Sequence, residues 1–320
     1  MSTELVARPQ SHPEPAIRYR FLREVLLLPE TDVKVIDARQ AVKDSALVSR
    51  LLSPRGADGR LPWHAYSKWR GAFWTLLQLE DLGYPPGDHS LMPLLEQVYD
   101  WLLDEARLKK IPLIDGRYRR CALQEASAVF CAIRFELIDE RVERLVHYLL
   151  KWQWPDGGWN CDKKPQASHS SFYETWLPLR AMHAYTELSG DRQARAAAER
   201  AAEVFLSHRL YKRHSDGSTM IAKFEELAYP PYWHYDILVG LRLMMEIGRL
   251  DDPRCKDALD WLESRQLPDG SFAASTKYYQ VTQKDISGVS LVQWGPVNPH
   301  KTNDFVTVRA LGVLKKAGRL

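Results

Sequence analysis

The sequence lacks the features that mark a membrane protein, a secreted protein or a nucleic-acid-binding protein. No stretch approaches the roughly 18 consecutive apolar residues of a membrane-spanning helix, and the N-terminal residues do not show the charged-then-apolar pattern of a secretion signal. The net charge is only +3, with both signs mixed along the chain, which does not favour nucleic acid as a partner. We therefore expect a cytoplasmic protein without a transmembrane segment and without a nucleic-acid partner.

Cysteines are few, and a flexible linker is absent. The four cysteines form no Cys-x-x-Cys pair, so reduced thiols are expected in a cytosolic protein. A length of 320 residues would allow two domains, but no Gly/Ser-rich stretch separates them. We predict a loose tail over residues 1–16 and a single domain over residues 17–320.

Five Asp-Gly pairs recur along the chain, each between two helix-like segments. Such recurrence is typical of an array that repeats one supersecondary unit. In each pair glycine supplies the positive φ of a tight turn, and aspartate can bond its own backbone. The pairs begin at Asp58, Asp115, Asp156, Asp216 and Asp269.

Two kinds of helix alternate between these turns. The first kind is amphipathic, with apolar residues three and four apart and a charged opposite face. We predict it at residues 32–52, 91–108, 140–152, 192–209 and 253–265. The second kind is apolar on nearly all sides and has to be buried. We predict it at residues 69–82, 122–137, 172–188, 232–247 and 304–317.

This alternation predicts an all-α fold with two concentric layers, in which half-buried outer helices surround fully buried inner ones. One segment breaks the alternation. Residues 271–301 show no helical pattern, and a loop of this length in a compact array is usually functional or mobile.

Two of the Asp-Gly turns carry a longer motif. Residues 142–159 read VERLVHYLLKWQWPDGGW, and residues 255–272 read CKDALDWLESRQLPDGSF. A helix followed by Gln-x-x-Asp-Gly-x-aromatic resembles the QW repeat of the squalene cyclase and protein prenyltransferase superfamily. The resemblance implies a single α/α toroid of about five outer and inner helix pairs around a central cavity, with ligands at one mouth. It also implies a structural role, tying outer helices together, for Gln153, Trp159, Gln266 and Phe272.

The first turns of the five buried helices each carry a charged residue near the same position. In a toroid these residues would face one mouth of the cavity, among aromatic side chains. The helix macrodipole alone favours acidic residues there, but a carboxyl group that burial keeps protonated could also act as a general acid. Glu174 and Asp236 have the richest aromatic surroundings and are the predicted catalytic acids. The other predicted cavity residues are Trp69, Arg70, Glu125, Tyr173, Trp176, Tyr232, Trp233, His234 and Asp304.

The motifs of standard terpene cyclases are absent. The chain has neither the Asp-x-Asp-Asp of protonation-type cyclases nor the Asp-Asp-x-x-Asp of ionisation-type synthases. The protein prenyltransferase β subunit, which is nearer in size, holds zinc with Asp, Cys and His at inner-helix starts. A comparable set here would be Cys161, His169 and His234, although no spacing requires it. No cofactor is expected from the sequence, with zinc as the alternative.

Three functions stay open. The sequence favours an enzyme that acts on a hydrophobic, isoprenoid-like small molecule by acid-initiated cyclisation or isomerisation, with aromatic faces stabilising a carbocation. One alternative is a non-catalytic toroid that binds an apolar ligand or a protein partner. The other is a zinc-dependent, prenyltransferase-like transferase. The oligomeric state does not follow from the sequence.

Overall fold

The computed structural model describes residues 11–320. About half of the chain is helical, and the small sheet consists of β1 (Leu113–Ile114) and β2 (Arg117–Tyr118) on either side of one Asp-Gly turn. The predicted all-α fold class is confirmed. In the part of the chain that the structure describes, no helix combines the length and the apolar character needed to cross a membrane.

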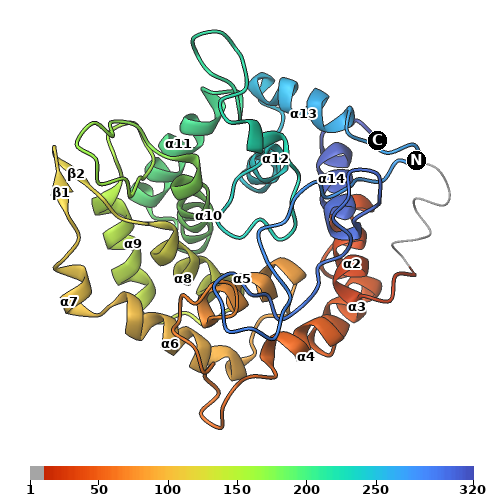
Figure 1. Cartoon of the computed structure of the whole chain (residues 1–320), viewed down its shortest axis with the longest axis horizontal. Coiled ribbons are helices and arrows are strands. Elements are labelled where there is room, and N and C mark those ends of the chain that lie inside the picture. The colour runs from red at the N-terminus through yellow and green to blue at the C-terminus, as the bar shows by residue number, and fades with distance from the viewer. Residues whose placement is uncertain (1–10) are drawn as a thin grey trace.

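Among the described residues, six helices form an inner layer (Figure 1). They contact one another in a closed circuit from α2 to α5, α8, α10, α12 and α14, and α14 returns to α2 and to the π-helical turn η1 that continues it. The bounds are Pro15–Arg20 for α2, Phe21–Val25 for η1, Ala72–Leu82 for α5, Leu123–Arg134 for α8, Phe172–Ser189 for α10, Ile237–Glu246 for α12 and Asp304–Lys316 for α14.

An outer helix follows each of the first five inner helices and packs against it. α3 contacts α2, α6 contacts α5, α9 contacts α8, α11 contacts α10, and α13 contacts α12. The bounds are Val33–Lys43 for α3, Met92–Leu102 for α6, Glu140–Trp152 for α9, Arg192–Leu206 for α11 and Lys256–Glu263 for α13. Shorter helical pieces are α4 (Ala46–Leu52), η2 (His89–Leu91), α7 (Glu105–Leu108), η3 (Ala222–Glu225) and η4 (Pro253–Cys255).

Burial separates the two layers as the sequence pattern predicts. In the outer helix α9 the buried residues recur three and four apart, whereas every residue of α14 from Phe305 to Leu314 is buried. Removing these apolar faces from water is the main force that holds the layers together. The assignment to the α/α toroid superfamily stays a prediction, which the closed circuit of inner helices supports.

The Asp-Gly turns have the predicted conformation. The glycines of all five pairs adopt positive φ, between 70° and 101°. Asp58 accepts a hydrogen bond from the amide of the residue two positions on, as do Asp216 and Asp269. In the longer motif, Gln153 donates to the carbonyl of Ala197 in α11 at 2.8 Å, so this glutamine does tie one outer helix to the next.

The N-terminal segment differs from the prediction. Residues 1–10 of the predicted tail lie outside the described residues, but the tail ends earlier than residue 16, because α2 begins at Pro15 and Ala16 is only 2% exposed. α2 has six residues and no Asp-Gly turn before it, which is too short for a periodic pattern to indicate. It provides an inner helix that the sequence analysis missed.

Two buried helices start later than predicted. α5 begins at Ala72 and not at Trp69, and α12 begins at Ile237 and not at Tyr232. Tyr232 follows two prolines and has a φ of 54°, which a right-handed helix does not contain. The predicted first-turn residues at these two places therefore lie in the loops that lead into the helices.

The segment 271–301 contains no helix, as predicted, and it packs across the ring near the starts of α5 and α12 (Figure 1). The amide of Trp69 donates to the carbonyl of Val289, and the amide of Gly288 donates to the carbonyl of Lys68. A bridge also joins Ala228 to Thr276. We refer to this segment as the covering loop.

Candidate functional site

Three charged residues of the predicted ring each lie against a polar side chain outside the ring. Arg70 pairs with Asp285 of the covering loop. The fully buried Glu125 accepts from Arg120 Nε at 3.0 Å and pairs with Arg107 at 3.4 Å. Asp304 lies 3.5 Å from His12. Each of these charges is thus matched by a neighbour close in space.

Asp236 serves as the N-cap of α12. One carboxylate oxygen accepts from the amide of Val239 at 2.8 Å and the other accepts from the amide of Ala228 at 3.2 Å. Burial raises the pKa of Asp236 to about 7, although both backbone hydrogen bonds favour the ionised form. Because both oxygens contact the backbone, the structure gives this carboxyl group a part in the fold.

The predicted aromatic residues do come together, but they pack on one another. Trp69 stacks on Tyr232 with 4.0 Å between ring centroids. His234 is stacked between Trp233 at 3.8 Å and Tyr278 of the covering loop at 3.3 Å. Tyr173 packs edge-to-face against Trp233. The indole N–H of Trp176 donates to the backbone carbonyl of Trp233. The aromatic group therefore closes this end of the ring together with the covering loop.

Below the aromatic group a cavity extends along the inner helices. Its empty space is about 670 Å³, including the part open to solvent. Of the cavity residues predicted from the sequence, Trp176 and Tyr232 line this cavity. The charged residues that line it were not predicted. The polar lining residues are Gln78, Glu80, Asp81, Arg180, Arg242 and Glu246.

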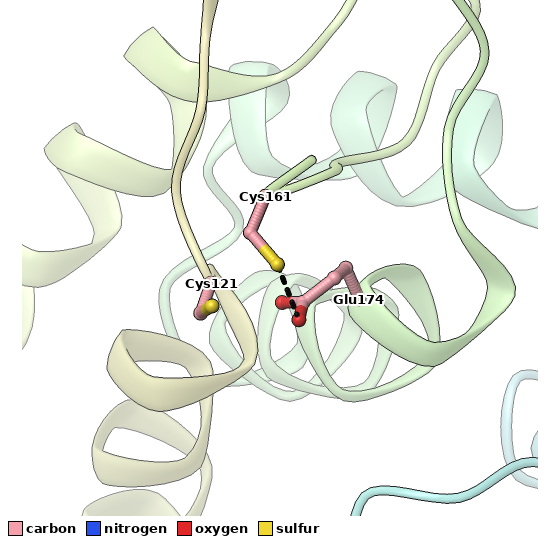
Figure 2. Close-up of side chains that lie close together, drawn as sticks. All are labelled: Cys121, Cys161 and Glu174. Carbon is pink, nitrogen blue, oxygen red and sulfur yellow. Dashed lines mark hydrogen bonds between the residues drawn. The ribbon is translucent and has the colours of Figure 1, made fainter. Parts of the chain in front are cut away.

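A second group of side chains lies where α8 and α10 begin (Figure 2). Cys121 comes two residues before α8, Cys161 follows the Asp-Gly turn after α9, and Glu174 lies in the first turn of α10. The two sulfur atoms and a carboxylate oxygen all lie within 4.8 Å of one another. The thiol of Cys161 donates to Oε1 of Glu174 at 3.3 Å.

The chain places each member of this group by local structure. Trp159, two residues before Cys161, is buried and donates its indole N–H to the carbonyl of Leu149 at 3.0 Å. Its amide donates to the hydroxyl of Thr175, the residue after Glu174, at 3.1 Å. The turn that carries Cys161 is therefore fixed against the first turn of α10.

The three acidic groups shift one another's protonation. Burial, together with the Cys121 thiol, raises the pKa of Glu174 well above its usual range, although the hydrogen bond from Cys161 acts in the opposite direction. Contact with Cys121, burial and the Glu174 carboxylate raise the pKa of Cys161. The same contact lowers the pKa of Cys121 to about 7. A negative charge on one group disfavours a negative charge on the others, and a bound cation would remove this conflict.

The carboxyl group of Glu174 also has an unused oxygen. The residue is 8% exposed, and its Oε2 is buried without a hydrogen-bond partner. Buried polar atoms are nearly always paired with protein, water or an ion. An orphaned carboxylate oxygen beside two thiols therefore fits a cation.

The alternative zinc set that the sequence offered, Cys161, His169 and His234, does not come together. His234 is held in the aromatic stack, and among the described residues the one group with metal-ligand spacing is Cys121, Cys161 and Glu174. His169 is not part of that group. The sequence analysis gave Cys121 no role beyond that of a reduced thiol, yet its position just before an inner helix places it next to Cys161.

Comparison with known proteins adds no family. No protein-family model matches the chain, and no curated protein matches it. The resemblance to the squalene cyclase and protein prenyltransferase superfamily therefore rests on the repeat motifs alone.

Proposed function

We propose that the protein is a zinc-dependent enzyme of the transferase type, with the metal held by Cys121, Cys161 and Glu174. The single observation that carries this proposal is the convergence of two sulfur atoms and an orphaned, buried carboxylate oxygen within 4.8 Å. Thiolate and carboxylate ligands suit zinc, and three protein ligands are typical of a catalytic site with one open position. Zinc in such a site lowers the pKa of a bound thiol or water molecule.

The protein residues around the group support a reacting site. Cys121 and Cys161 are partly exposed, so the group can be reached from outside. Burial, with a smaller contribution from the nearby Glu174, raises the pKa of Tyr66, so its phenol stays protonated and can donate a hydrogen bond to a ligand. Arg120 contributes a positive charge that favours the thiolate of Cys121.

Metal analysis tests the proposal directly. We expect the purified wild-type chain to carry about one equivalent of zinc, as a three-ligand site implies, and Cys121→Ser, Cys161→Ser and Glu174→Gln each to lose most of it. Cobalt added to the metal-free protein should give thiolate-to-cobalt charge-transfer absorption, which the two serine variants lose. Cys255→Ser is the matched control, because Cys255 is a buried cysteine outside the group.

The proposal fails if the wild type binds neither zinc nor cobalt, or if the control loses as much metal as the ligand variants. Thermal unfolding of all four variants separates loss of the site from loss of the fold.

A second function is favoured by the protonation of Glu174. A neutral, buried carboxylic acid could start the cyclisation or isomerisation of an alkene substrate, as the sequence analysis proposed. The two functions differ in the role of the cysteines. With any substrate that is turned over, acid catalysis requires Glu174 but tolerates Cys121→Ser, whereas the metal site requires both residues.

A further inference from the structure

The far half of the cavity is lined by charged residues that the proposed metal site does not use. Arg242, in the C-terminal half of α12, lies 3.6 Å from Glu24 and 3.6 Å from Asp81. Asp81 also pairs with Arg309 at 2.7 Å, and Glu24 pairs with Arg20 at 3.0 Å. These five residues form one connected ion-pair group, which we call the Arg242 group.

Counted by itself, the Arg242 group carries a charge of +1, and Arg242 also lies near enough to Asp236 to act on that carboxyl group. The group contains three guanidinium groups, each of which is always protonated, and two carboxylates. Burial by itself would raise the pKa of Asp81. The three arginines outweigh this effect and hold the pKa far below its usual value. The neighbouring ion pairs, of Arg134 and Arg180 with Glu80 and Glu246, are balanced and supply no counter-charge.

Arg242 is also short of hydrogen-bond partners. Both of its ion-pair distances exceed hydrogen-bond length, and its Nε is buried without a partner among the described residues. A guanidinium group has five N–H donors in a planar fork that matches a carboxylate. Its side chain lines the cavity, so these donors are available to a bound molecule.

A second unpaired group lies in the same cavity wall. Gln78 is 4% exposed, and its Nε2 donates to the carbonyls of Trp69 at 3.1 Å and Trp74 at 2.9 Å. These two bonds fix the orientation of the amide, which leaves Oε1 buried without a partner. Gln78 lines the cavity, and an unpaired acceptor in the cavity wall calls for a donor such as a hydroxyl group.

We propose that the cavity binds a small organic monoanion that carries a carboxylate, a hydroxyl group and an apolar body. The carboxylate pairs with Arg242, and the hydroxyl group donates to Oε1 of Gln78. The apolar body packs on Trp74, Trp176 and Tyr232, which line the same cavity. A single excess positive charge favours a monoanion, because Glu80, Asp81 and Glu246 in the wall repel further negative charge.

This site is separate from the proposed metal site. Arg242 and Asp81 lie in the C-terminal halves of inner helices, whereas Cys121 and Glu174 lie where inner helices begin. Glu246 in the cavity wall is about one-third exposed, so a ligand enters from the end of the ring that the covering loop does not close. The inference therefore stands whether or not the chain binds zinc.

Titration calorimetry with matched probes tests the site. Phenyllactate carries all three features, phenylpropionate lacks the hydroxyl group, and phenylpropionamide lacks the charge as well. We expect affinity to fall in that order, with quenching of tryptophan fluorescence for the probes that bind. Arg242→Gln should lower the affinity for phenyllactate by at least about tenfold, as expected for the loss of a charge-assisted hydrogen bond. It should leave the affinity for phenylpropionamide unchanged. Gln78→Leu should remove the difference between phenyllactate and phenylpropionate.

The matched control is Arg195→Gln, which removes an exposed arginine of the outer helix α11 that does not line the cavity. It should bind phenyllactate like the wild type, and chelation of metal should change nothing. The inference is overturned if no probe binds, if acid and amide bind the wild type equally, or if Arg242→Gln binds phenyllactate normally. Thermal unfolding checks that each variant is folded.

Discussion

At the scale of single residues, the structure separates two carboxylates that look equivalent in the sequence. Glu174 and Asp236 both precede or begin an apolar helix next to aromatic residues, and both are buried. Asp236 accepts two backbone hydrogen bonds, whereas Glu174 contacts a thiol and keeps one oxygen unpaired. The difference arises from residues distant in sequence, because Ala228 and Cys161 decide what each carboxylate contacts. Of the two, Glu174 is therefore the one that the proposed function uses.

Asp236 gives a prediction for the pH dependence of stability. Its pKa is raised to about 7 in the fold, while an unfolded chain has the lower, ordinary aspartate value. Between these values the folded state holds a proton that the unfolded state has released, so the free energy of unfolding falls as pH rises, by at most about 1.4 kcal/mol per pH unit. Asp236→Asn should remove this slope, since asparagine cannot titrate and still caps helices.

The measurement is urea unfolding of wild type and Asp236→Asn from about pH 4 to about pH 8, where the difference is expected to develop. Asparagine places a donor opposite one backbone amide, which adds a penalty that does not depend on pH. The test is therefore the change of the free energy of unfolding with pH, compared between the two proteins, and not its absolute value. Parallel pH profiles for the two proteins would show that Asp236 is ionised throughout.

At the scale of elements, the joint between the covering loop and α14 depends on one asparagine. Asn303 is fully buried and caps α14 by accepting from the amide of Val306 at 3.1 Å. Its Nδ2 donates to the carbonyls of Trp294 at 2.9 Å and Pro296 at 3.0 Å, both in the loop. One side chain therefore starts the last inner helix and holds the end of the loop.

Substitution of Asn303 separates these two roles. Asn303→Asp keeps the helix cap but loses both donors to the loop, and Asn303→Ala loses everything. We expect the alanine variant to lose about 2–4 kcal/mol of stability, from a lost cap and unpaired buried carbonyls. Limited proteolysis within residues 271–301 should accelerate in both variants, while thermal unfolding shows the larger loss for alanine. If both variants resist the protease as well as the wild type does, Asn303 does not hold the loop.

The helices were predictable where local pattern decides them. The bounds of α9 agree with the prediction at both ends, because an aspartate cap and a regular apolar repeat mark it. The predicted helix at 32–52 instead divides into α3 and α4 at Asp44 and Ser45, since Ser45 caps a new helix. α12 starts late because Tyr232 has a positive φ, which a right-handed helix does not contain. Stacking of Tyr232 on Trp69 stabilises this backbone conformation. Such packing is not visible in a local pattern.

At the scale of the whole molecule, both proposed sites depend on contacts between segments far apart in sequence. Cys121, Cys161 and Glu174 come from three successive parts of the repeat, and only the parallel arrangement of α8 and α10 brings them together. The Arg242 group joins α2, η1, α5, α12 and α14. The sequence predicted acids at the starts of the inner helices, among them Glu174, but it gave Cys121 no part there. It could not predict the Arg242 group, because the helix that supplies Glu24 was not recognised.

Closure of the ring can be tested at Gly312 in α14. This residue faces η1, and a Cβ atom added to it would lie 2.8 Å from Cβ of Glu24. Gly312→Val should therefore push the last inner helix away from the first and lower stability by about 1–3 kcal/mol, as overpacking does in cores. Lys316→Val is the matched control, because it adds the same branched side chain to an exposed position of the same helix.

Because Glu24 also pairs with Arg242, Gly312→Val should affect the cavity as well as the contact between α14 and η1. We expect a lower melting temperature together with weaker phenyllactate binding, whereas Lys316→Val should change neither appreciably. Melting temperatures and titration calorimetry on the two variants make the comparison. If Gly312→Val melts like Lys316→Val, contact between α14 and η1 does not hold the ring closed, and the fold tolerates an open seam between its first and last inner helices.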